Sequence, residues 1–258
     1  MTKEEKPTLS EEKAAELFFQ MASADRKRIL FELEKEELRL NEVAKRLGMT
    51  STETLRQLQR LTESSLIQRE PEGPYVMTEY GRLVLQLSSS LEFITQHRDY
   101  FLTHDVRCLP RRFLDRIGVL ANANFVSQTS EAMNGLLQLR TEAREFIWGA
   151  GVEGSFRVGP SLSEKVSQGV SFRLLFREKS LPPLAFQRIT GAEWRALEDI
   201  PVSIVLSEKD GAVSFCLVGG KADYTGFGGS DPEFYDWVKE LFLYYWEGAR
   251  RNLSPKTK

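Results

Sequence analysis

One stretch of the chain, residues 38–78, constrains the fold most because it joins two short helical patterns, a tight turn and two strand patterns: LRLNEVAKRLGMTSTETLRQLQRLTESSLIQREPEGPYVMT. Asn41 is expected to cap the first helix, and Gly48 to end it where a left-handed residue is needed. Thr50 and Glu53 have the T-x-x-E spacing of a capping box, which predicts the start of a second helix. The pattern therefore predicts two helices joined by a tight turn.

The second of these helices carries leucines at every third position, Leu55, Leu58 and Leu61, which predict a buried stripe. At about 100° per residue, the opposite side of the helix is polar and contains arginines. Arginine is the side chain that most often recognises guanine edges in the major groove of DNA. The residues of this helix that we predict to face DNA are Ser51, Thr52, Arg56, Gln57 and Arg60.

The residues after this helix alternate between apolar and polar through 66–70, turn at P-E-G-P and return through 75–78. A helix-turn-helix followed by a hairpin is a winged helix, whose second helix is shaped to enter a DNA major groove. Within the hairpin, we predict that Arg69 and Tyr75 contact the DNA backbone. The N-terminal part of the chain is therefore predicted to be an α+β winged helix-turn-helix domain.

The charge of this stretch leaves a second interpretation open. Residues 38–78 contain six basic and five acidic side chains, and six minus five leaves a net charge of +1. Phosphate contacts normally come from a more basic surface. The whole chain has a formal net charge of -2, so any attraction to nucleic acid is local. Short helical units also serve as protein-interaction modules, and the arginines could instead pair with Glu53 and Glu63 along the helix.

Composition limits the remaining classes of protein. A length of 258 residues suits one large domain or two small ones, and 41% hydrophobic residues are enough for real cores. The two cysteines, Cys108 and Cys216, are too few for a disulfide framework or a zinc site, and two histidines exclude a histidine-based metal cluster. The N-terminus is charged and no apolar run approaches about 18 residues, so we expect no signal peptide and no membrane span. A cytoplasmic protein without a cofactor is the expectation.

A long helix capped by Thr78 is expected after the hairpin. Its apolar residues follow alternating steps of three and four, the a/d pattern of a coiled-coil seam. This pattern predicts a homodimer, although the same face could pack on its own domain or the next one. The seam residues are Met77, Tyr80, Val84, Leu87, Leu91 and Ile94. We assign residues 1–99 to the DNA-binding domain with its dimerisation helix, and residues 100–258 to a second domain.

The second domain has the alternating strand and helix pattern of an α/β fold. Apolar runs at 145–150 and 170–176 flank a helix that begins at a capping box at Ser161, which predicts a parallel β-α-β unit. Runs at 202–206 and 213–218 predict a hairpin. An aromatic-rich amphipathic helix is expected near the end of the domain.

Three segments resemble known families. The segment TSTETLRQLQRLTESSLIQREPEGPYVMTEYG, residues 50–81, resembles the winged helices of archaeal transcriptional regulators. Two further segments resemble the effector domain of the archaeal methanogenesis-regulator (Fil) type: YFLTHDVRCLPRRFLDRIGVL and GKADYTGFGGSDPEFYDWVKELFLYYWE. The most specific parts are the H-D-x-x-x-x-P run that begins at His104 and the terminal L-F-x-Y-Y-W. The resemblance covers nearly the whole chain after residue 20.

This resemblance implies a cytoplasmic regulator whose second domain has a phospholipase-D-like topology and receives a signal. The target process does not carry over, because many proteins of this type have no role in methanogenesis. One residue departs from the pattern: Ser65 stands where the family usually has glycine, at the end of the recognition helix. If the backbone there is left-handed, the serine is strained.

Catalysis is not expected in the second domain. A phospholipase-D-type enzyme needs a His nucleophile with Lys two residues later, but His97 is followed by R-D and His104 by D-V. The chain also lacks a G-x-S-x-G setting and a P-loop, and the glycines of 226–229 are expected to form a flexible turn. His104 beside Asp105 could suggest a polarised base, but a capping or linker role is the more ordinary interpretation.

A ligand site is predicted beyond the carboxyl ends of the two parallel strands, where open α/β sheets collect ligands. Gly149 and Gly151 would let a ligand approach the backbone, and Arg177 would supply a cation for an anionic group. The helix capped at Ser161 would add free N–H groups. A simpler interpretation gives the glycines to the turn and Arg177 to a surface ion pair.

Two functions from different classes fit these observations. The first is a sequence-specific, homodimeric transcription regulator that binds double-stranded DNA and responds to a small-molecule effector. The second is an interaction protein that recruits basal transcription proteins through its winged helix and its aromatic C-terminal helix. Salt-sensitive, specific DNA binding would distinguish the first from the second.

Overall fold

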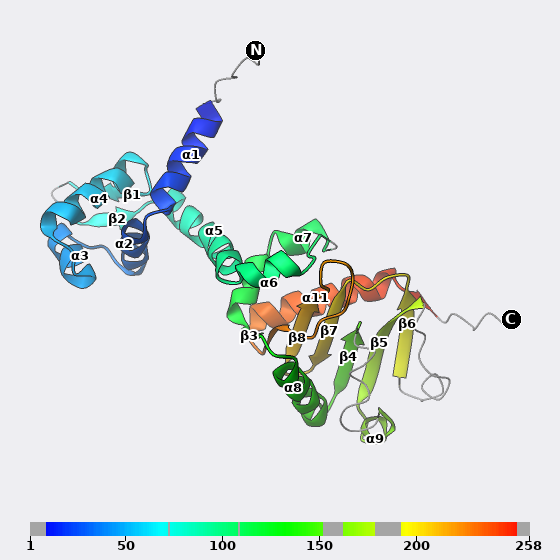
Figure 1. Cartoon of the computed structure of the whole chain (residues 1–258). Coiled ribbons are helices and arrows are strands. Elements are labelled where there is room, and N and C mark those ends of the chain that lie inside the picture. Colours follow the sequence, from blue (N-terminus) through cyan, green and yellow to red (C-terminus); the bar gives the residue numbers. More distant parts are fainter. Residues whose placement is uncertain (1–8, 72, 108, 152–161, 179–191, 252–258) are drawn as a thin grey trace, which may run out of the picture. The chain divides into compact units, whose positions relative to one another are not determined.

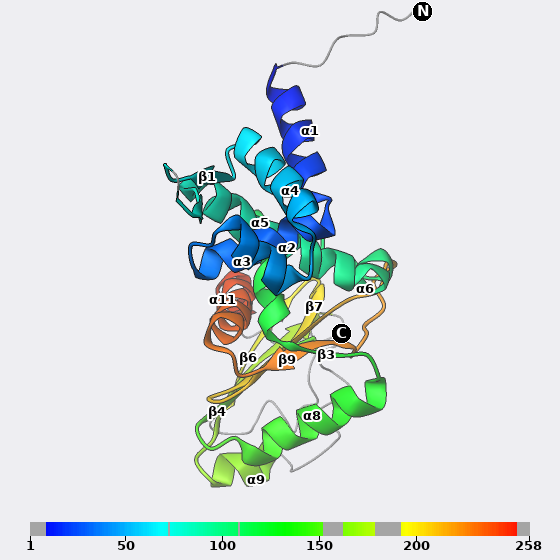
Figure 2. The ribbon, with the colours of Figure 1, turned by 90° about the vertical axis from the view of Figure 1, so that its left-hand side faces the viewer.

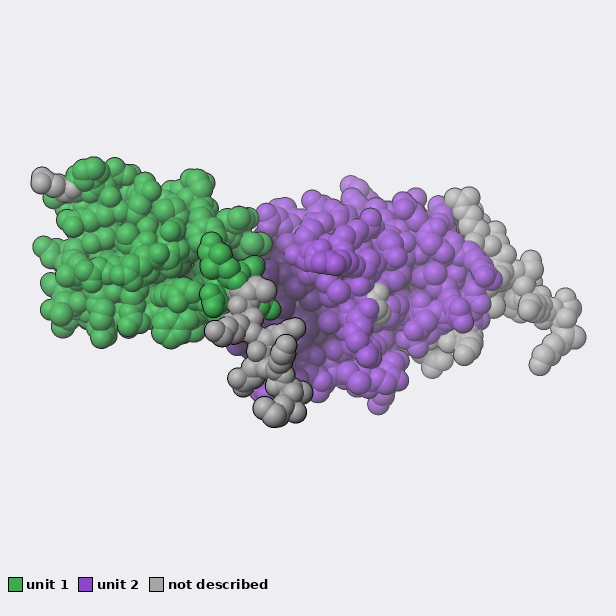
Figure 3. Space-filling model, turned by 90° about the horizontal axis from the view of Figure 1, so that it is seen from above, with its two compact units in different colours: residues 1–89 green, residues 90–258 purple. Residues whose placement is uncertain are grey.

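The structure, a computed structural model, describes residues 9–71, 73–107, 109–151, 162–178 and 192–251 (Figure 1). The chain folds as two compact units, residues 1–89 and 90–258, which Figure 3 shows in different colours. Each unit has its own hydrophobic core. Within these described ranges, no helix combines the length and the apolar character needed to cross a membrane.

The described residues of the first unit form four helices, a two-stranded wing and the beginning of a long helix (Figure 1). Its elements are α1 (Leu9–Met21), α2 (Ala24–Lys35), α3 (Leu40–Leu47), α4 (Ser51–Glu63), β1 (Ile67–Arg69), β2 (Tyr75–Met77) and α5 (Glu79–Gln96). The two strands pair antiparallel with Ile67 opposite Met77, and Leu38 forms an antiparallel bridge with Tyr75. Helices α3 and α4 followed by this hairpin confirm the predicted winged helix-turn-helix fold.

The turn between α3 and α4 follows the predicted chemistry. Gly48 has a left-handed backbone with φ +66° and ends α3. The hydroxyl of Thr50 accepts a hydrogen bond at 3.2 Å from the backbone N–H of Glu53 and caps α4. Two residues, Gly48 and Thr50, were therefore enough to predict this turn from the sequence.

The start of α3 differs from the prediction. The helix begins at Leu40, and the carboxylate of Glu42 accepts a hydrogen bond at 2.6 Å from the backbone N–H of Arg39. Asn41 therefore lies inside the helix, and its predicted role as the cap is wrong. As in a capping box, a glutamate at the third helical position accepts a hydrogen bond from the backbone N–H of the residue just before the helix.

The buried stripe of α4 also differs from the leucine pattern. Leu58 and Leu61 are fully buried, but Leu55 is 39% exposed, and Thr54 and Gln57 take its place in the interior. Each step of three residues falls about 60° short of a full helical turn. Three leucines at that spacing therefore rotate around the helix, and the first of them leaves the buried side.

The core of the first unit gathers side chains from α2, α3, α4, both strands and α5. Helix α2 contributes most of its inner face to this cluster, with side chains that are completely or almost completely buried. The buried members of the cluster are Ile29, Leu30, Leu33, Leu38, Val43, Leu58, Leu61, Leu66, Ile67, Tyr75, Met77 and Leu85. This core fixes α4 and the wing against one another.

Ser65, the departure from the family pattern, has φ +60° and is the sole non-glycine residue with positive φ among the described residues. It follows the last residues of α4, where its N–H donates to the Thr62 carbonyl at 2.9 Å. The condition set by the sequence, a left-handed backbone at this serine, is therefore met. A left-handed conformation costs an L-residue about 1–2 kcal/mol.

We expect Ser65→Gly to raise the free energy of unfolding of the first unit by about 0.5–1 kcal/mol, because relief of the left-handed strain exceeds the extra entropy of glycine in the unfolded chain. Ser64 is a matched control with φ -84°. Ser64→Gly should instead lower the free energy of unfolding, since no strain is relieved there. Urea denaturation of both variants measures the difference, and destabilisation by Ser65→Gly would contradict the prediction.

The second unit is built on one mixed sheet (Figure 1). Its helices are α6 (Arg98–Thr103), α7 (Arg111–Leu114), the 3-10 helix η1 (Ile117–Asn122), α8 (Thr129–Glu142), α9 (Leu162–Ser167) and α11 (Pro232–Gly248). Its strands are β3 (Asn124–Val126), β4 (Phe146–Ala150), β5 (Ser171–Arg177), β6 (Ala192–Leu197), β7 (Val202–Ser207), β8 (Gly211–Phe215), β9 (Gly226–Gly229) and β10 (Arg250–Arg251). Across the described ranges the strand order is β10-β6-β5-β4-β7-β8-β9-β3.

The strand pairing confirms the α/β prediction and extends it. Strands β4 and β5 are parallel neighbours connected through α9, and β7 and β8 form the predicted antiparallel hairpin. Strand β6 adds a further parallel neighbour, whereas β8, β9 and β3 continue the sheet antiparallel. The glycines of 226–229, expected to form a flexible turn, instead form β9 because they pair with β8 on one side and β3 on the other.

The sheet separates α11 from α8, as Figure 2 shows. Helix α11 packs on one face with Trp237, Val238 and Leu241 fully buried, together with alternate residues of β7 such as Ile204. The other residues of β7 point to the opposite face, where Val205 meets α8. The two helices therefore differ in how much they bury: α11 packs on its face with many buried side chains, whereas α8 has few.

Helix α5 contributes to both units. Its buried residue Leu85 belongs to the core of the first unit, whereas Phe93 belongs to the core of the second. The division at residues 89 and 90 therefore falls earlier than the boundary expected between residues 99 and 100. The cause is the aromatic side chain of Phe93, which packs on Phe101 and Phe227.

Candidate functional site

The exposed face of α4 is the first candidate site. Ser51, Thr52 and Arg56 are exposed, as predicted from their position opposite the buried side of the helix. Leu55 and Gln59 are also exposed on this helix and were missed by the sequence analysis. The signal that could have found them is the 3.6-residue period, which places both beside Arg56 once Thr54 and Leu58 face inward.

Arg56 forms an ion pair along the helix. Its guanidinium lies 2.5 Å from the carboxylate of Glu53, one turn earlier. The hydrogen bond from Arg56, followed by that from Gln57, lowers the pKa of Glu53, and the same pair raises the pKa of Arg56. An exposed pair at this spacing is worth only tenths of a kcal/mol. A phosphate group of a ligand can therefore replace the Glu53 carboxylate as the partner of the Arg56 guanidinium.

Arg60 has a different setting. Its side chain is half-buried, and none of the salt bridges among the described residues involves it. The buried Arg26 lies close enough for the charge of Arg60 to lower its pKa, after burial itself. After the hydrogen bonds from Arg56 and Gln57, the charge of Arg60 also lowers the pKa of Glu53. Among the described residues Arg60 forms no ion pair, which distinguishes it from Arg56.

Gln57 lies on the opposite side of α4 from DNA-accessible residues. It is 6% exposed, its amide oxygen accepts from the Arg26 guanidinium at 3.2 Å, and its amide nitrogen donates to Glu53. Arg26 is itself held by the carbonyls of Phe19 and Gln20. This placement argues against the predicted DNA contact, because Gln57 links α4 to α1 and α2 instead.

Of the two wing residues predicted to contact DNA, one is exposed and the other is buried. Arg69 is exposed at the end of β1. Tyr75 is 5% exposed and belongs to the core, with the Arg69 guanidinium 5.6 Å from its ring centroid. The wing can therefore present the Arg69 guanidinium to a phosphate. Tyr75 packs against that guanidinium and is itself too buried to suit a direct DNA contact.

Helix α5 carries an exposed apolar face. The side chains of this face recur in steps of three and four along the helix, as the a/d pattern predicts. Val84 departs from the predicted seam because it is half-buried and packs on the core of the first unit, and Met77 is buried there too. The exposed members are Tyr80, Leu83, Leu87, Leu91 and Ile94.

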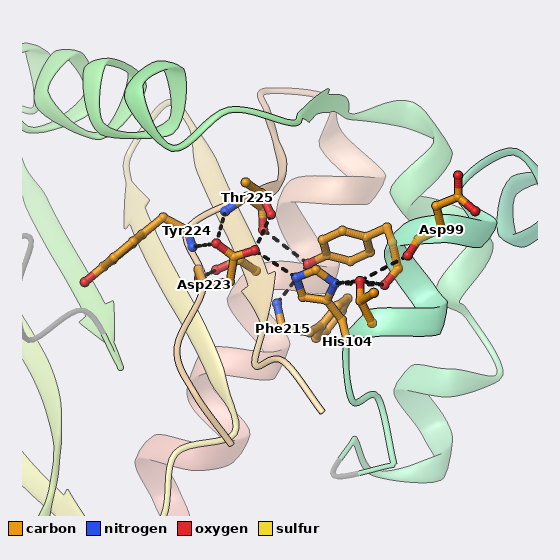
Figure 4. A network of polar contacts seen from close by, with 9 residues as sticks. Asp99, His104, Phe215, Asp223, Tyr224 and Thr225 are labelled. Carbon is orange, nitrogen blue, oxygen red and sulfur yellow. Dashed lines mark hydrogen bonds and ion pairs between the residues drawn. The ribbon is translucent and has the colours of Figure 1, made fainter. Parts of the chain in front are cut away.

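In the second unit, His104 takes part in a polar network (Figure 4). Its Nε2 lies 3.0 Å from a carboxylate oxygen of Asp223, and its Nδ1 lies 2.8 Å from the carbonyl of Tyr100. The imidazole also stacks on the Tyr100 ring at 3.7 Å. Asp105, the neighbour considered as a partner in sequence, pairs with Arg107 instead. Both nitrogens of His104 thus serve the fold, which fits the linker interpretation.

Asp223 organises the segment before β9. Its carboxylate accepts hydrogen bonds from the backbone N–H of Tyr224 and from the hydroxyl of Thr225. Burial alone would raise the pKa of Asp223, but the hydrogen bonds from Thr225 and His104 outweigh burial and lower it. The network therefore fixes the backbone from which Tyr224 projects, and Figure 4 shows the Tyr224 ring pointing away from the network.

The residues predicted for an anion site have other partners. Arg177 donates to the carbonyl of Ile200 at 3.0 Å and lies 3.5 Å from Asp199. A side chain on Gly151, where φ is +66°, would meet the carbonyl oxygen of Val202 at 2.4 Å. Gly149 is buried within β4, and Ser161 lies outside the described residues. These contacts suit the simpler interpretation, in which the glycine serves the turn and Arg177 an ion pair.

Metal binding has no visible site in the part of the chain that the structure describes, because no three His, Cys, Asp or Glu residues gather there in a suitable group.

No protein-family model matches the sequence, and no curated protein matches it. Among solved structures, the archaeal chromatin protein TrmBL2 aligns over 87% of this chain and 92% of its own, with 16% identity and a TM-score of 0.39. HlyU from Vibrio cholerae covers 35% of this chain and 92% of its own, with 26% identity and a TM-score of 0.28. The homodimeric winged helix-turn-helix domain of Mb0332 from Mycobacterium bovis covers 38% and 92%, with 21% identity and a TM-score of 0.31. Such low scores carry no argument, so the winged-helix assignment rests on the geometry described above.

Proposed function

We propose that the chain is a sequence-specific DNA-binding transcription regulator that works as a homodimer and responds to a signal received by its second unit. The observation that carries the proposal is the exposed face of α4, the second helix of a helix-turn-helix with a wing. In this fold the second helix lies in the major groove. Arg56, Gln59 and Leu55 on that face are of residue types that can contact base edges.

Five of the exposed residues of α4 have a suitable chemical partner on DNA. Arg56 can donate two hydrogen bonds to guanine, and Gln59 can pair with adenine in the same bidentate manner. Leu55 can contact a thymine methyl group, which explains an apolar side chain left exposed on this face. Ser51 and Thr52 lie in the first turn of α4, where free backbone N–H groups favour a phosphate. Together these groups could both read sequence and fix the register.

The phosphate contacts would come from Arg60 on α4 and Arg69 on the wing. Neither forms a salt bridge with another described residue, so neither has to give up a carboxylate to bind DNA. Contacts of this kind position the protein on DNA without reading sequence. The local charge is small, so we expect modest affinity that falls as salt increases.

The second unit is proposed to receive a signal rather than to catalyse a reaction, because the sequence lacks the H-x-K nucleophile of phospholipase-D-type enzymes. A phospholipase-D-like topology and a Fil-type effector role belong to this same proposal. Homodimerisation is proposed to use the exposed apolar face of α5, whose spacing suits a second copy of the same helix.

The test is binding to the DNA upstream of the gene that encodes the chain, measured by fluorescence anisotropy at several salt concentrations. Arg56→Ala should weaken specific binding by about 1–3 kcal/mol and relax base preference at one position. Arg60→Ala should weaken binding to all sequences and reduce the salt dependence, because it removes a phosphate contact. Arg82→Ala is the matched control, since Arg82 is exposed on α5 and paired with Glu79.

The proposal fails if wild-type protein shows no salt-sensitive preference for any segment of this DNA over unrelated DNA. The assignment of the α4 face fails separately if specific binding exists but neither arginine variant changes it.

A further inference from the structure

A large hollow lies between α8 and the sheet in the second unit. It has a volume of about 780 Å³, is partly open to solvent, and is lined by residues of α8, β3, β7, β8 and β9. Protein interiors are close-packed and rarely leave voids of this size. Pockets for small molecules, by contrast, have volumes of about 300–1,000 Å³. The hollow is therefore of the right size for a ligand.

The hollow exists because both of its walls carry small side chains. On the sheet, Ala212 and Gly228 are cross-strand partners, and Ser214 lies on the same face two residues along β8. On the helix, Ala132 and Gly135 stand where larger residues would be needed to reach the sheet. In the C-terminal half of α8, Leu136 and Leu139 pack on Val205 of β7.

The two glycines Gly135 and Gly228 are not required by the backbone. Neither has positive φ, and a side chain on Gly228 would meet only ordinary contacts, the nearest being the Gly211 carbonyl at 3.6 Å. A side chain on Gly135 would meet no atom within 4 Å. A glycine inside a helix costs about 1 kcal/mol relative to alanine. The visible consequence of both glycines is the space they leave.

The lining of the hollow indicates what would fill it. Met133 and Leu136 of α8 are only half-buried, although they face the interior, and Leu139 closes one end against Val205. The ring of Tyr224 adds an aromatic wall. A helix on a sheet normally buries its apolar stripe, so an apolar molecule in the hollow would complete this core.

Polar groups restrict the charge of such a molecule. Among the described residues, the lining includes the acidic residues Glu131 and Asp210 and no lysine or arginine. Neither carboxylate forms a salt bridge with the other described residues. An anion entering the hollow would meet uncompensated like charge, whereas a neutral or cationic molecule would not. The hydroxyls of Ser203 and Ser214 offer lone pairs for orientation.

We propose that the hollow between α8 and strands β7, β8, β9 and β3 binds an apolar small molecule that carries no negative charge. The inference deepens the proposed sensor role of the second unit and rests on it for its biological meaning. The strands that form the hollow also carry aromatic side chains that pack next to the end of α5. Phe125 and Phe227 belong to strands β3 and β9, which border the hollow, but Phe227 lies in the core on the opposite face of the sheet. Both rings pack on His97, the residue after α5, at 4.7 and 5.3 Å between ring centroids.

A matched pair of dyes tests the site in the full chain. N-phenyl-1-naphthylamine is neutral and apolar, and 8-anilino-1-naphthalenesulfonate has the same rings with an added sulfonate. Fluorescence titration should show saturable binding of one neutral dye per chain, and at least about tenfold weaker binding of the sulfonate, equivalent to about 1.4 kcal/mol. Glu131→Gln combined with Asp210→Asn should narrow that difference.

Two variants locate the dye. Gly228→Leu fills the hollow from the sheet and should weaken binding of the neutral dye at least about tenfold. Ala132→Leu fills it from α8 and should do the same, which keeps the test intact if the strand variant folds poorly. Gly248→Leu, at the end of α11, is the control, because a side chain there meets no atom within 4 Å and lies outside the hollow. Its binding should match wild type.

The proposal is overturned if wild type shows no saturable binding of the neutral dye, or if both leucine variants bind it as tightly as wild type does. Equal affinity for the sulfonate in the same hollow would overturn the exclusion of anions. The sensor role fails separately: in that case the dye binds in the hollow but leaves the affinity for DNA unchanged.

Discussion

Trp237→Ala should lower the free energy of unfolding of the second unit by about 3–5 kcal/mol, the usual cost of truncating a buried tryptophan. Trp237 is completely buried on α11 and packs edge-on against Phe113 at 5.5 Å. Its indole N–H donates to the Phe113 carbonyl at 3.3 Å. A domain is stable by only about 5–15 kcal/mol, so this single change removes a large share of the stability.

Calorimetry of the full chain measures the effect. The core of the first unit contains no residue of α11, so its transition should remain where it is while the transition of the second unit moves down. Tyr244→Ala is the matched control, because Tyr244 is an aromatic residue of the same helix that is 42% exposed. The control should cost about 1 kcal/mol or less. A parallel fall of both transitions would contradict the independence of the two cores.

Local rules were sufficient for much of the first unit. Gly48 and Thr50 fix a turn through their own backbone and hydroxyl, so no distant partner was needed to place it. The P-E-G-P turn and the alternation around it placed the wing in the same way. Ser65 is informative because the departure from a family pattern indicated where strain would arise if φ were positive, and φ there is +60°.

The direction of individual side chains could not be predicted so well. Gln57 and Tyr75 look like surface residues in the sequence, but Arg26 recruits the first into a buried hydrogen bond and Leu38 pairs with the second. Both partners are distant in the sequence, and nothing in the local pattern announces them. Leu55 shows the opposite error: it was predicted to be buried because it is apolar, but it is exposed on the same side of α4 as Arg56.

The hollow in the second unit was hidden for a related reason. The glycines of 226–229 are typical of a turn, and only pairing with β8 and β3 makes them a strand. Once they form a strand, the absence of side chains becomes empty volume opposite Ala132 and Gly135. Sequence patterns report which residues prefer to be buried, but a cavity depends on which small residues meet across two elements.

Replacing Leu87 and Leu91 by glutamate should convert a dimer into a monomer and weaken DNA binding by about 100-fold or more, since two linked half-sites bind far more tightly than one. The two leucines are 64% and 57% exposed on α5 in the single chain. Full burial of a leucine contributes about 1.5–3 kcal/mol, and a dimer buries each of them twice. Carboxylates on that face would have to lose their water without gaining a partner.

The folded single chain should tolerate these substitutions, because both side chains already face solvent and glutamate is a good helix former. Leu102→Glu is the matched control, because Leu102 is 62% exposed and lies on a different helix, α6. Sedimentation velocity at micromolar concentration should show dimers for wild type and for this control, and monomers for the double variant. A wild type that sediments as a monomer would contradict the dimer. A double variant that remains dimeric would assign the interface to another surface, such as the exposed Phe18 and Phe19 of α1, because two buried carboxylates at an α5 contact could not be accommodated.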